Sequence, residues 1–287
     1  MFSITGITGN IGGEVARHLL SARQPVRAVM RDARKAPAWE QRGCEIAIAD
    51  IGDAAALAAA FKGAEGVFVL VPPNFDPIPG FPEARAIAAA LQSALEIARP
   101  GRVVYLSTIG AQATQTNLLS QHSLIEQALR ELPLPITFLR PAWFMENFAW
   151  DVAPARENGV IPSFLQPLDK PVPMVATADI GRIAAELLQE KWSGHRIVEL
   201  EGPRRVTPNQ AAAAFSNLLR HPVKMEVVPR ETWEPLFRSQ GVKNPEPRIR
   251  MLDGFNEGWI EFEGGQTGSR KGTVALETVL QGLTDRP

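Results

Sequence analysis

The feature that most constrains this chain is a glycine-rich turn near its start. The letters TGITGNIG occupy residues 5–12, at the end of an apolar, strand-like stretch, and a helical pattern follows them. At such a strand–turn–helix junction Gly6 permits the tight turn, Gly9 lets the backbone approach a pyrophosphate, and Gly12 lets the helix pack close to the sheet. The start of the helix then offers N–H groups to phosphate. The turn predicts a dinucleotide site; the alternative is a turn that needs glycine only for its own geometry.

The first half of the chain alternates short strand-like runs with longer helical patterns. The strand-like runs are rich in apolar or β-branched residues and lie at 2–5, 26–31, 45–49, 66–71, 102–107 and 136–140. Between them, apolar residues recur at spacings of three and four, which predicts helices. Strands joined through helices form right-handed crossovers in a parallel sheet. We therefore expect an α/β protein with a doubly wound, Rossmann-type parallel sheet.

The pattern loosens after about residue 150. Prolines interrupt 162–175 too often for a helix, whereas a helix is expected from Asp179 and a strand at 195–200. Thr207, followed by proline and then by glutamine at the third helical position, predicts a further helix start.

Two parts of unequal size follow from this pattern. We expect a dinucleotide-binding core at 1–150 and a smaller, discontinuous C-terminal α/β lobe for substrate at 151–287. Within the second part, residues from about 176 to 200 are expected to return to the core.

Composition excludes several classes of protein. The 30 basic and 31 acidic residues nearly cancel, which argues against nucleic acid or a membrane surface as a partner. The single cysteine, Cys44, excludes an internal disulfide and a cysteine-based zinc site. His18, His195 and His221 lack ligand spacing, so no metal is expected. Met1 leads into an apolar strand without a signal-peptide pattern, and no long apolar stretch occurs, so a cytoplasmic protein is expected.

The end of the second strand indicates which dinucleotide binds. A site for NAD usually places Asp or Glu there to hold the ribose hydroxyls. Here the strand ends in Arg31, and Lys35 follows four residues later. A guanidinium holds the 2′-phosphate of NADP through paired hydrogen bonds, and a lysine adds a point charge. We therefore expect NADP(H) rather than NAD(H); the alternative is that both are solvated surface charges and that Asp32 takes the ribose.

Two further strand ends are expected to border the cofactor, because ligands of open α/β sheets lie beyond the carboxyl ends of the strands. Asp50 follows the third strand and is placed to meet the adenine amino group. Val71, Pro72 and Pro73 follow the fourth strand and would wall the adenosine and nicotinamide side. Ordinary strand-end packing or capping is the alternative for each of them.

Several motifs together resemble the NmrA-like branch of the atypical short-chain dehydrogenases/reductases. They are TGITGNIG, AVMRD, IADIGD, VVYLSTIGA, FLRPAWFMENF, ATADIGRIAAELL and ELEGPRRVTPNQ, in this order along the chain. The resemblance runs from residue 1 to about 225, with a looser match at 251–264. Within the family the chain is most similar to bacterial NAD(P)H:quinone oxidoreductases and triphenylmethane-dye reductases. Fungal NmrA is similar in fold but is a dinucleotide-sensing regulator.

The resemblance carries a cofactor-binding role onto the positions that match the family's motifs. In the first half these are Gly6, Thr8, Gly9, Asn10, Ile11, Gly12, Arg31, Lys35, Asp50, Pro72, Pro73 and Asn74. In the segment after the sixth strand, which borders the nicotinamide in this family, they are Pro141, Ala142, Trp143, Phe144 and Asn147. Ser107, at the end of the fifth strand, is counted with the same site.

The chain departs from the wider superfamily at its catalytic positions. Most short-chain dehydrogenases use a Tyr-x-x-x-Lys pair on the helix after the fifth strand, in which the tyrosine is the general acid. The only tyrosine here, Tyr105, lies inside the fifth strand and is followed by Ile109 in place of the lysine. The expected helix carries His122 and Glu126 instead, as NmrA-like proteins commonly do. A tyrosine-dependent mechanism is therefore excluded.

His122 is the candidate catalytic residue. Its spacing of four from Glu126 places both on one helix face, where the histidine can donate a proton beside the nicotinamide. The alternative is a structural or cofactor-positioning pair, because His122 shares its face with Ile125 and Leu129. A quinone or dye is strongly electrophilic and accepts hydride with little assistance, so a reductase without the usual acid is physically reasonable.

Aromatic residues are expected to line a pocket for a flat acceptor. The proline-rich loop 72–82 contributes Phe75 and would form a wall or lid, while Trp143 and Phe144 approach from the sixth strand. The alternatives are a plain connection for the loop and core packing for aromatic residues such as Phe148. Further candidates to close the pocket from the C-terminal lobe are Trp233, Phe237 and Trp259.

These features predict an NADPH-dependent reductase that transfers hydride to a small planar electrophile such as a quinone or a dye. The alternative is an NADP(H)-sensing regulatory protein that acts through a protein partner. An isoflavone-type reductase would usually carry a lysine on the helix of His122, and Glu126 counts against it. A homodimer is left open.

Overall fold

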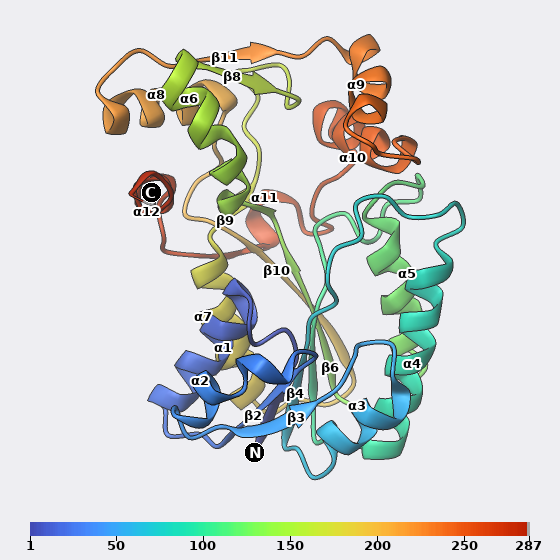
Figure 1. Ribbon diagram of the computed structural model, residues 1–287. Coiled ribbons are helices and arrows are strands. Elements are labelled where there is room, and N and C mark those ends of the chain that lie inside the picture. The colour runs from blue at the N-terminus through green and yellow to red at the C-terminus, as the bar shows by residue number, and fades with distance from the viewer. Residues whose placement is uncertain (286–287) are drawn as a thin grey trace.

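A parallel sheet forms the centre of the molecule. The computed structural model describes residues 1–285, without the side chain of residue 266. The strands of the sheet are β1 (Phe2–Ile4), β2 (Val26–Met30), β3 (Glu45–Ile48), β4 (Gly66–Val69), β5 (Val103–Leu106), β6 (Ile136–Pro141), β10 (His195–Glu201) and β12 (Arg270–Lys271). Within residues 1–285 these eight strands are parallel and lie in the order β12-β10-β6-β5-β4-β1-β2-β3 (Figure 1). The predicted doubly wound α/β fold is confirmed.

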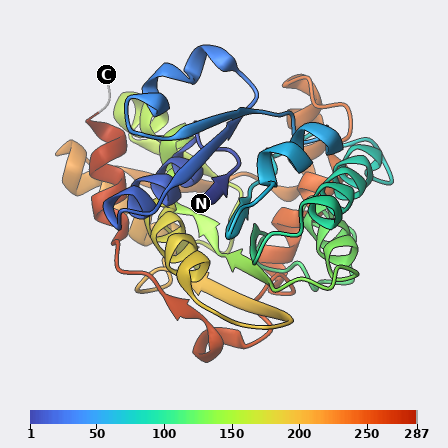
Figure 2. The ribbon, with the colours of Figure 1, turned by 90° about the horizontal axis from the view of Figure 1, so that it is seen from below.

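Helices cover both faces of this sheet, as Figure 2 shows from below. One face carries α1 (Asn10–Ser21) and α7 (Thr177–Gln189), which pack against each other. The other carries α3 (Ala54–Phe61), α4 (Pro82–Ala98) and α5 (Ser120–Leu129). The central strands are apolar without alternation because both of their faces are buried.

Of the two helix starts predicted after residue 150, one is confirmed and one is wrong by two residues. Thr207 forms a capping box at the start of α8 (Pro208–Leu219). The helix expected from Asp179 begins at Thr177, because the carboxylate of Glu146 accepts the Thr177 N–H at 2.9 Å and its hydroxyl at 2.6 Å. Asp179 is buried and accepts the N–H groups of Thr273 and Val274 instead, both at 2.8 Å.

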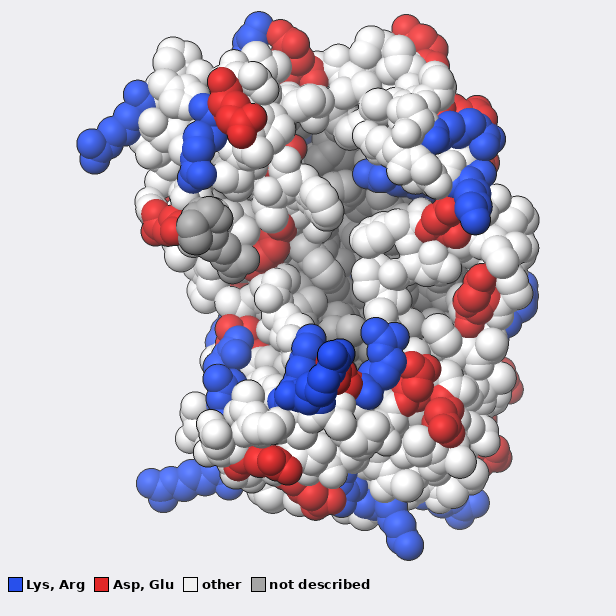
Figure 3. Space-filling model, in the orientation of Figure 1, with Lys and Arg blue, Asp and Glu red and all other residues white. Residues whose placement is uncertain are grey.

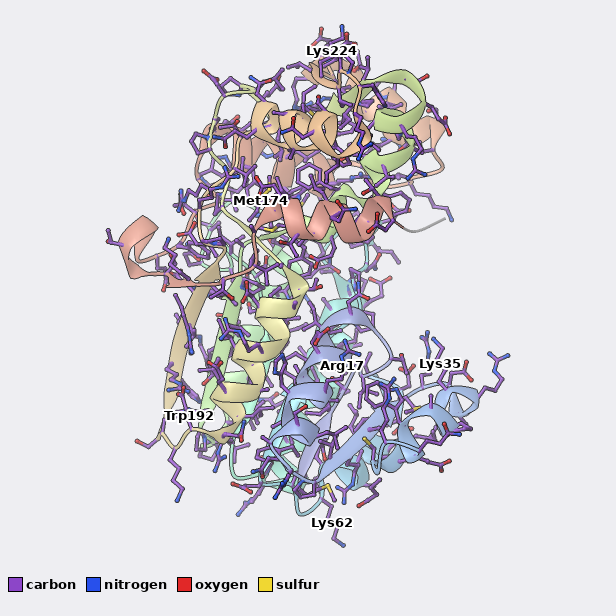
Figure 4. The ribbon with its side chains drawn as sticks, turned by 90° about the vertical axis from the view of Figure 1, so that its left-hand side faces the viewer. Arg17, Lys35, Lys62, Met174, Trp192 and Lys224 are labelled. Atoms are coloured by element: carbon purple, nitrogen blue, oxygen red, sulfur yellow. The ribbon has the colours of Figure 1, made fainter. Side chains whose placement is uncertain are left out.

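A smaller lobe lies over the carboxyl ends of the strands (Figures 1 and 4). Its elements are η2 (Met145–Asp151), α6 (Val152–Asn158), β8 (Val160–Ser163), α8, β11 (Lys224–Val227), η3 (Arg230–Thr232), α9 (Trp233–Ser239), α10 (Glu246–Glu257), α11 (Gly265–Gly268) and α12 (Leu276–Thr284). Strands β8 and β11 pair in parallel. Figure 4 shows Met174 at the junction of the two parts and Lys224 at the far end of the lobe.

The chain passes between the two parts more than once. After β6 it pairs β7 (Trp143–Phe144) with β9 (Met174–Val175) under the lobe. It then returns to the sheet through α7 and β10 before building the rest of the lobe. No helix within residues 1–285 has the length and apolar character of a membrane span.

Candidate functional site

The glycine-rich turn joins β1 to α1 in a conformation that residues with a side chain rarely adopt. Gly6 has a φ of 63°, and a Cβ at Gly12 would lie 2.4 Å from the carbonyl oxygen of Gly6. Thr8, Gly9 and Asn10 are exposed. The backbone of the turn is therefore pressed against the helix on one side and open to a ligand on the other.

The N-terminus of α1 has no internal partner. Gly9 is its N-cap, and no side chain in the described part of the chain hydrogen-bonds to its first turn. Ile11 and Gly12 are buried, so these two predicted cofactor residues offer a ligand only their backbone. Free N–H groups at the positive end of a helix dipole bind phosphate.

Basic side chains flank this end of the sheet. Arg31 follows β2, and Lys35 lies in η1 (Ala33–Lys35), which precedes α2 (Pro37–Glu40); both are exposed. Figure 3 shows a hollow between lobe and core, with basic side chains gathered on its core side, over the segment between β2 and α2. Figure 4 shows that Lys35 projects away from the sheet. A bound phosphate at this edge would meet two exposed cations.

Asp32 is engaged with a different residue. Its carboxylate accepts two guanidinium N–H groups of Arg34, at 2.9 and 3.0 Å, and the backbone N–H of Arg34 at 3.1 Å. The hydrogen bond from the Arg34 side chain lowers the pKa of Asp32. This pairing counts against the alternative in which Asp32 holds a ribose.

Asp50 lies beside Arg31 at the end of β3. One of its oxygens is 3.9 Å from the Arg31 guanidinium, and the other accepts the N–H of Gly52 at 2.9 Å. Both side chains are largely exposed, so the pair adds little to stability. The structure therefore brings together Arg31 and Asp50 from neighbouring strand ends.

Thr5 fixes the distance between the glycine-rich turn and the segment after β4. Its hydroxyl accepts the N–H of Leu70 at 2.8 Å, and its own N–H donates to the carbonyl of Phe68 at 3.0 Å. Val71 is half-buried and the two prolines after it are exposed. The end of β4 thus lies directly beside the turn.

The loop 72–81 bridges the core and the lobe. The carboxylate of Asp76 accepts the N–H of Lys243 at 3.0 Å and that of Asn244 at 2.6 Å, and these bonds lower the pKa of Asp76. On the core side, the carbonyl of Asn74 accepts the side-chain amide of Gln121 at 3.0 Å. Phe75, between these two anchors, is 61% exposed. These hydrogen bonds attach the loop to both the core and the lobe, so the loop does more than connect β4 to α4.

Tyr105 and His122 form a pair that the sequence did not reveal. The tyrosine is fully buried in β5, and its oxygen is 2.7 Å from Nδ1 of His122 on α5. Burial raises the pKa of Tyr105 well above its ordinary value, so the phenol keeps its proton. Burial lowers the pKa of His122 to about 4, despite the charge of Glu126, so the imidazole is neutral near pH 7.

The direction of this hydrogen bond follows from the absence of another acceptor. No other hydrogen-bond partner for the Tyr105 hydroxyl exists in the described part of the chain. A buried hydroxyl must donate its proton, so Tyr105 donates to Nδ1 and the proton of the imidazole resides on Nε2. Nε2–H has no protein partner among residues 1–285 and is not sealed from solvent. His122 therefore offers one fixed N–H donor.

Among the described residues, the Glu126 carboxylate forms no hydrogen bond to the His122 side chain and belongs to a separate buried network. Its carboxylate accepts two N–H groups of Arg140, at 2.9 and 2.7 Å, and the hydroxyl of Ser107 at 2.6 Å. Burial opposes its ionisation, but the hydrogen bonds and charge of Arg140 outweigh burial and hold the pKa of Glu126 below its ordinary value. His122 and Glu126 share a helix face without a hydrogen bond between their side chains in the described part of the chain, and the charge of Glu126 acts on His122 only electrostatically. The Ser107 hydroxyl is likewise taken up inside the protein.

The segment after β6 passes under the lobe. Pro141 and Ala142 are buried, Trp143 and Phe144 are half-buried, and Asn147 is exposed. The Trp143 ring packs edge-on against Phe255 of α10, with ring centroids 5.2 Å apart. The predicted aromatic residues therefore lie at the junction of core and lobe.

Some predicted pocket residues serve the core instead. Trp233 and Phe237 are fully buried, and their cluster also contains Ile249. Phe148 is buried and packs edge-on against Phe215. These aromatic rings cannot line an open pocket because packing already covers them. The described residues contain no cluster of three His, Cys, Asp or Glu side chains that suits a metal.

Three functional features were missed from the sequence. They are the Tyr105–His122 pair, the Glu126–Arg140 ion pair and the Asp76 anchor to the lobe. Each joins residues that are remote along the chain and carry no common motif. Tyr105, His122 and Glu126 stood out individually in the sequence, but nothing in the sequence indicated their partners.

Comparisons with known proteins show the family and agree with the fold. The sequence profile of the NmrA-like family matches residues 2–258, which confirms the resemblance seen in the motifs. An NAD(P)H azoreductase of Xenophilus azovorans is 29% identical over 259 residues, which cover 90% of this chain and 85% of that protein. Quinone oxidoreductase 2 of Escherichia coli is 27% identical over 218 residues, covering 75% and 73%. The crystal structure of Citrobacter sp. triphenylmethane reductase complexed with NADP(H) has a TM-score of 0.81 at 22% identity, covering 98% of this chain and 99% of that one.

Proposed function

This chain belongs to the NmrA-like family, and on that premise we propose that it is an NADPH-dependent reductase. It transfers a hydride to a small planar electrophile such as a quinone or a dye. The observation that carries the proposal is that the start of α1, which no side chain caps, follows β1, while the exposed Arg31 and Lys35 follow the neighbouring parallel strand β2. Two relatives named as an NAD(P)H azoreductase and a quinone oxidoreductase support the acceptor class.

The residues at the strand ends fit NADPH in an extended pose. The turn at Gly9 and the first N–H groups of α1 would hold the pyrophosphate. Arg31 and Lys35 would hold the 2′-phosphate, since Asp32 is occupied by Arg34. Asp50 and the segment 71–74 would border the adenosine. Trp143 and Phe144 would border the nicotinamide. When bound, NADPH supplies a hydride, and a quinone that accepts it also takes up a proton.

His122 would act as a hydrogen-bond donor rather than as an acid. With a pKa of about 4 the imidazole carries no extra proton to give at pH 7. Its Nε2–H, fixed by the bond from Tyr105 to Nδ1, can stabilise negative charge that develops on an acceptor oxygen. The acceptor then takes its proton from solvent. This assignment makes the missing Tyr–Lys pair unnecessary, because a strongly electrophilic acceptor needs orientation more than acid catalysis.

NADPH oxidation in the presence of a panel of quinones and dyes tests the proposal. We expect turnover with NADPH, a lower KM for NADPH than for NADH, and a rate that does not follow an imidazolium titration between pH 6 and 8. Tight NADPH binding without turnover of any acceptor would contradict the reductase and favour an NADP(H)-sensing protein that acts through a partner. Capture of a protein partner with and without NADPH then tests the sensor. The cytoplasmic location and a homodimer stay predictions of the sequence.

A further inference from the structure

One guanidinium at the inner wall of the lobe has no charge partner. Arg248 lies on the first turn of α10 and is half-buried. No carboxylate of residues 1–285 pairs with it, and no hydrogen bond to its guanidinium is formed. The other buried or half-buried arginines of this part of the chain each pair with an acid; they are Arg27, Arg102, Arg140, Arg182, Arg196, Arg205 and Arg250.

An aromatic ring holds this guanidinium in place. The Arg248 Cζ lies 4.3 Å from the centroid of the Phe237 ring, and Phe237 is fully buried. Stacking on a ring face orients the planar group but leaves the N–H groups at its edge without acceptors. Burial without a partner lowers the pKa of Arg248, which reflects the cost of a desolvated charge.

The neighbours of Arg248 place it at the acceptor end of the site. Phe255 lies seven residues after Arg248 on the same face of α10, and its ring packs against Trp143. The carbonyl of Pro247 accepts the N–H of Leu118, just before the helix that carries His122. Asp76 binds the chain at Lys243 on the other side. Figure 3 shows basic side-chain atoms on the lobe side of the hollow, below α10.

We propose that Arg248 binds an anionic substituent, a carboxylate or a sulfonate, on the planar acceptor, so that this chain prefers acceptors that carry such a group. The inference rests on the proposed reductase function and adds the substrate class. A guanidinium edge matches two oxygens of a carboxylate or sulfonate. The phosphates of NADPH already have their own donors at α1, Arg31 and Lys35, on the core side of the hollow. A ligand anion bound at Arg248 would provide the negative charge that no carboxylate of residues 1–285 provides there.

Equilibrium binding tests the proposal without turnover. The probes are anthraquinone-2-sulfonate, anthraquinone-2-carboxylate and the neutral 2-(hydroxymethyl)anthraquinone, each titrated by tryptophan fluorescence with NADP⁺ present. We expect both anions to bind about tenfold to a hundredfold more tightly than the neutral quinone. Arg248→Gln should remove this preference and leave the affinity for the neutral quinone and for NADP⁺ unchanged. Arg248→Lys should keep part of it.

Arg238→Gln is the matched control, because Arg238 lies on the neighbouring helix α9, is exposed and pairs with Glu234; it should keep the full preference. If Arg248→Gln does not fold, the wild-type preference should itself shrink as NaCl rises from about 0.05 M to about 0.5 M. An equal loss for all three quinones, or no preference in the wild type, overturns the proposal. Failure of the proposed reductase function would be seen separately, as no NADPH oxidation with the neutral quinone. The ratio of the affinities for the anionic and the neutral quinones would still decide the role of Arg248.

Discussion

Two regions of the core sheet use their polar groups in opposite ways. Around β1 and β2, the start of α1 is uncapped, and Arg31 and Lys35 project into solvent. Around β5 and β6, polar groups are buried and bonded inside the protein, with Tyr105 donating to His122 and Arg140 paired with Glu126. Buried polar groups must find partners, whereas a binding site keeps its groups free for a ligand.

This difference separates binding residues from residues that only hold the site in shape. A polar residue near the expected cofactor is a binding candidate only if the fold leaves it accessible and outside short internal hydrogen bonds. Lys35 and Arg31 meet this criterion, because both are exposed and the ion pair of Arg31 with Asp50 is long, at 3.9 Å. Ser107 and Glu126 do not meet it, because they bind each other and Glu126 binds Arg140. Arg248 meets the criterion in the lobe, although no sequence motif pointed to it.

The largest effect is expected at the turn. Gly12→Ala places a Cβ 2.4 Å from the carbonyl oxygen of Gly6, which forces the turn and α1 apart. We expect NADPH binding, measured by fluorescence titration, to fall at least about a hundredfold. Gly282→Ala is the control, because no atom lies near its Cβ position in α12, and it should bind NADPH normally. Wild-type affinity in Gly12→Ala would remove the turn from the binding site.

The next largest effect is expected in the buried network. Glu126→Gln leaves the Arg140 guanidinium buried without a full counter-charge, which should lower the free energy of unfolding by about 3 to 5 kcal/mol in a urea titration. Glu131→Gln, at an exposed position just after the same helix, should change stability by less than about 0.5 kcal/mol. A stable Glu126→Gln with altered NADPH affinity would instead place this residue in the binding site.

A smaller and more selective effect is expected at the end of β2. Arg31→Gln removes a charged donor from the proposed 2′-phosphate site, so KM for NADPH should rise about tenfold to a hundredfold while KM for NADH stays constant. Arg17→Gln serves as the control because Arg17 is an exposed residue of α1 that pairs with Glu14. Equal changes for both coenzymes would count against recognition of the phosphate.

The smallest effect is a pH dependence of stability. The pKa of His122 falls to about 4 on folding, so the unfolded chain binds more protons between about pH 4 and pH 6.5, and stability from this group is lost as pH falls through that window. Asp151, whose pKa burial raises to about 7, acts in the opposite direction. The wild type is therefore compared with the variant His122→Asn, because Asp151 is present in both proteins and its effect on stability cancels.

Thermal unfolding at pH 7 and pH 5 measures this effect. The free energy of unfolding of the wild type, relative to that of His122→Asn, should fall by about 1 to 2 kcal/mol from pH 7 to pH 5. His18→Asn, at an exposed position of α1, is the control for loss of a histidine as such. A difference that does not change with pH would mean that His122 is not buried in its neutral form.

The sequence by itself determined the fold and was enough to propose the residues at the cofactor end of the site. The glycine spacing, the alternation of strand and helix patterns and the basic end of β2 are local signals, because each depends on residues that are close along the chain. Residues Gly6 to Gly12 and the two cations therefore stood out before any contact was known. The same local reasoning showed that the tyrosine lies in the wrong element for the usual mechanism.

Only the tertiary structure decided which polar groups are free. Tyr105 reaches His122 across 17 positions, Arg140 reaches Glu126 across 14, and Asp76 reaches Lys243 across 167. No spacing rule covers such pairs, since they depend on which elements the sheet and the lobe bring together. The absence of a partner for Arg248 is equally a property of the fold, because a charge is unpaired only when packing brings no opposite charge near it.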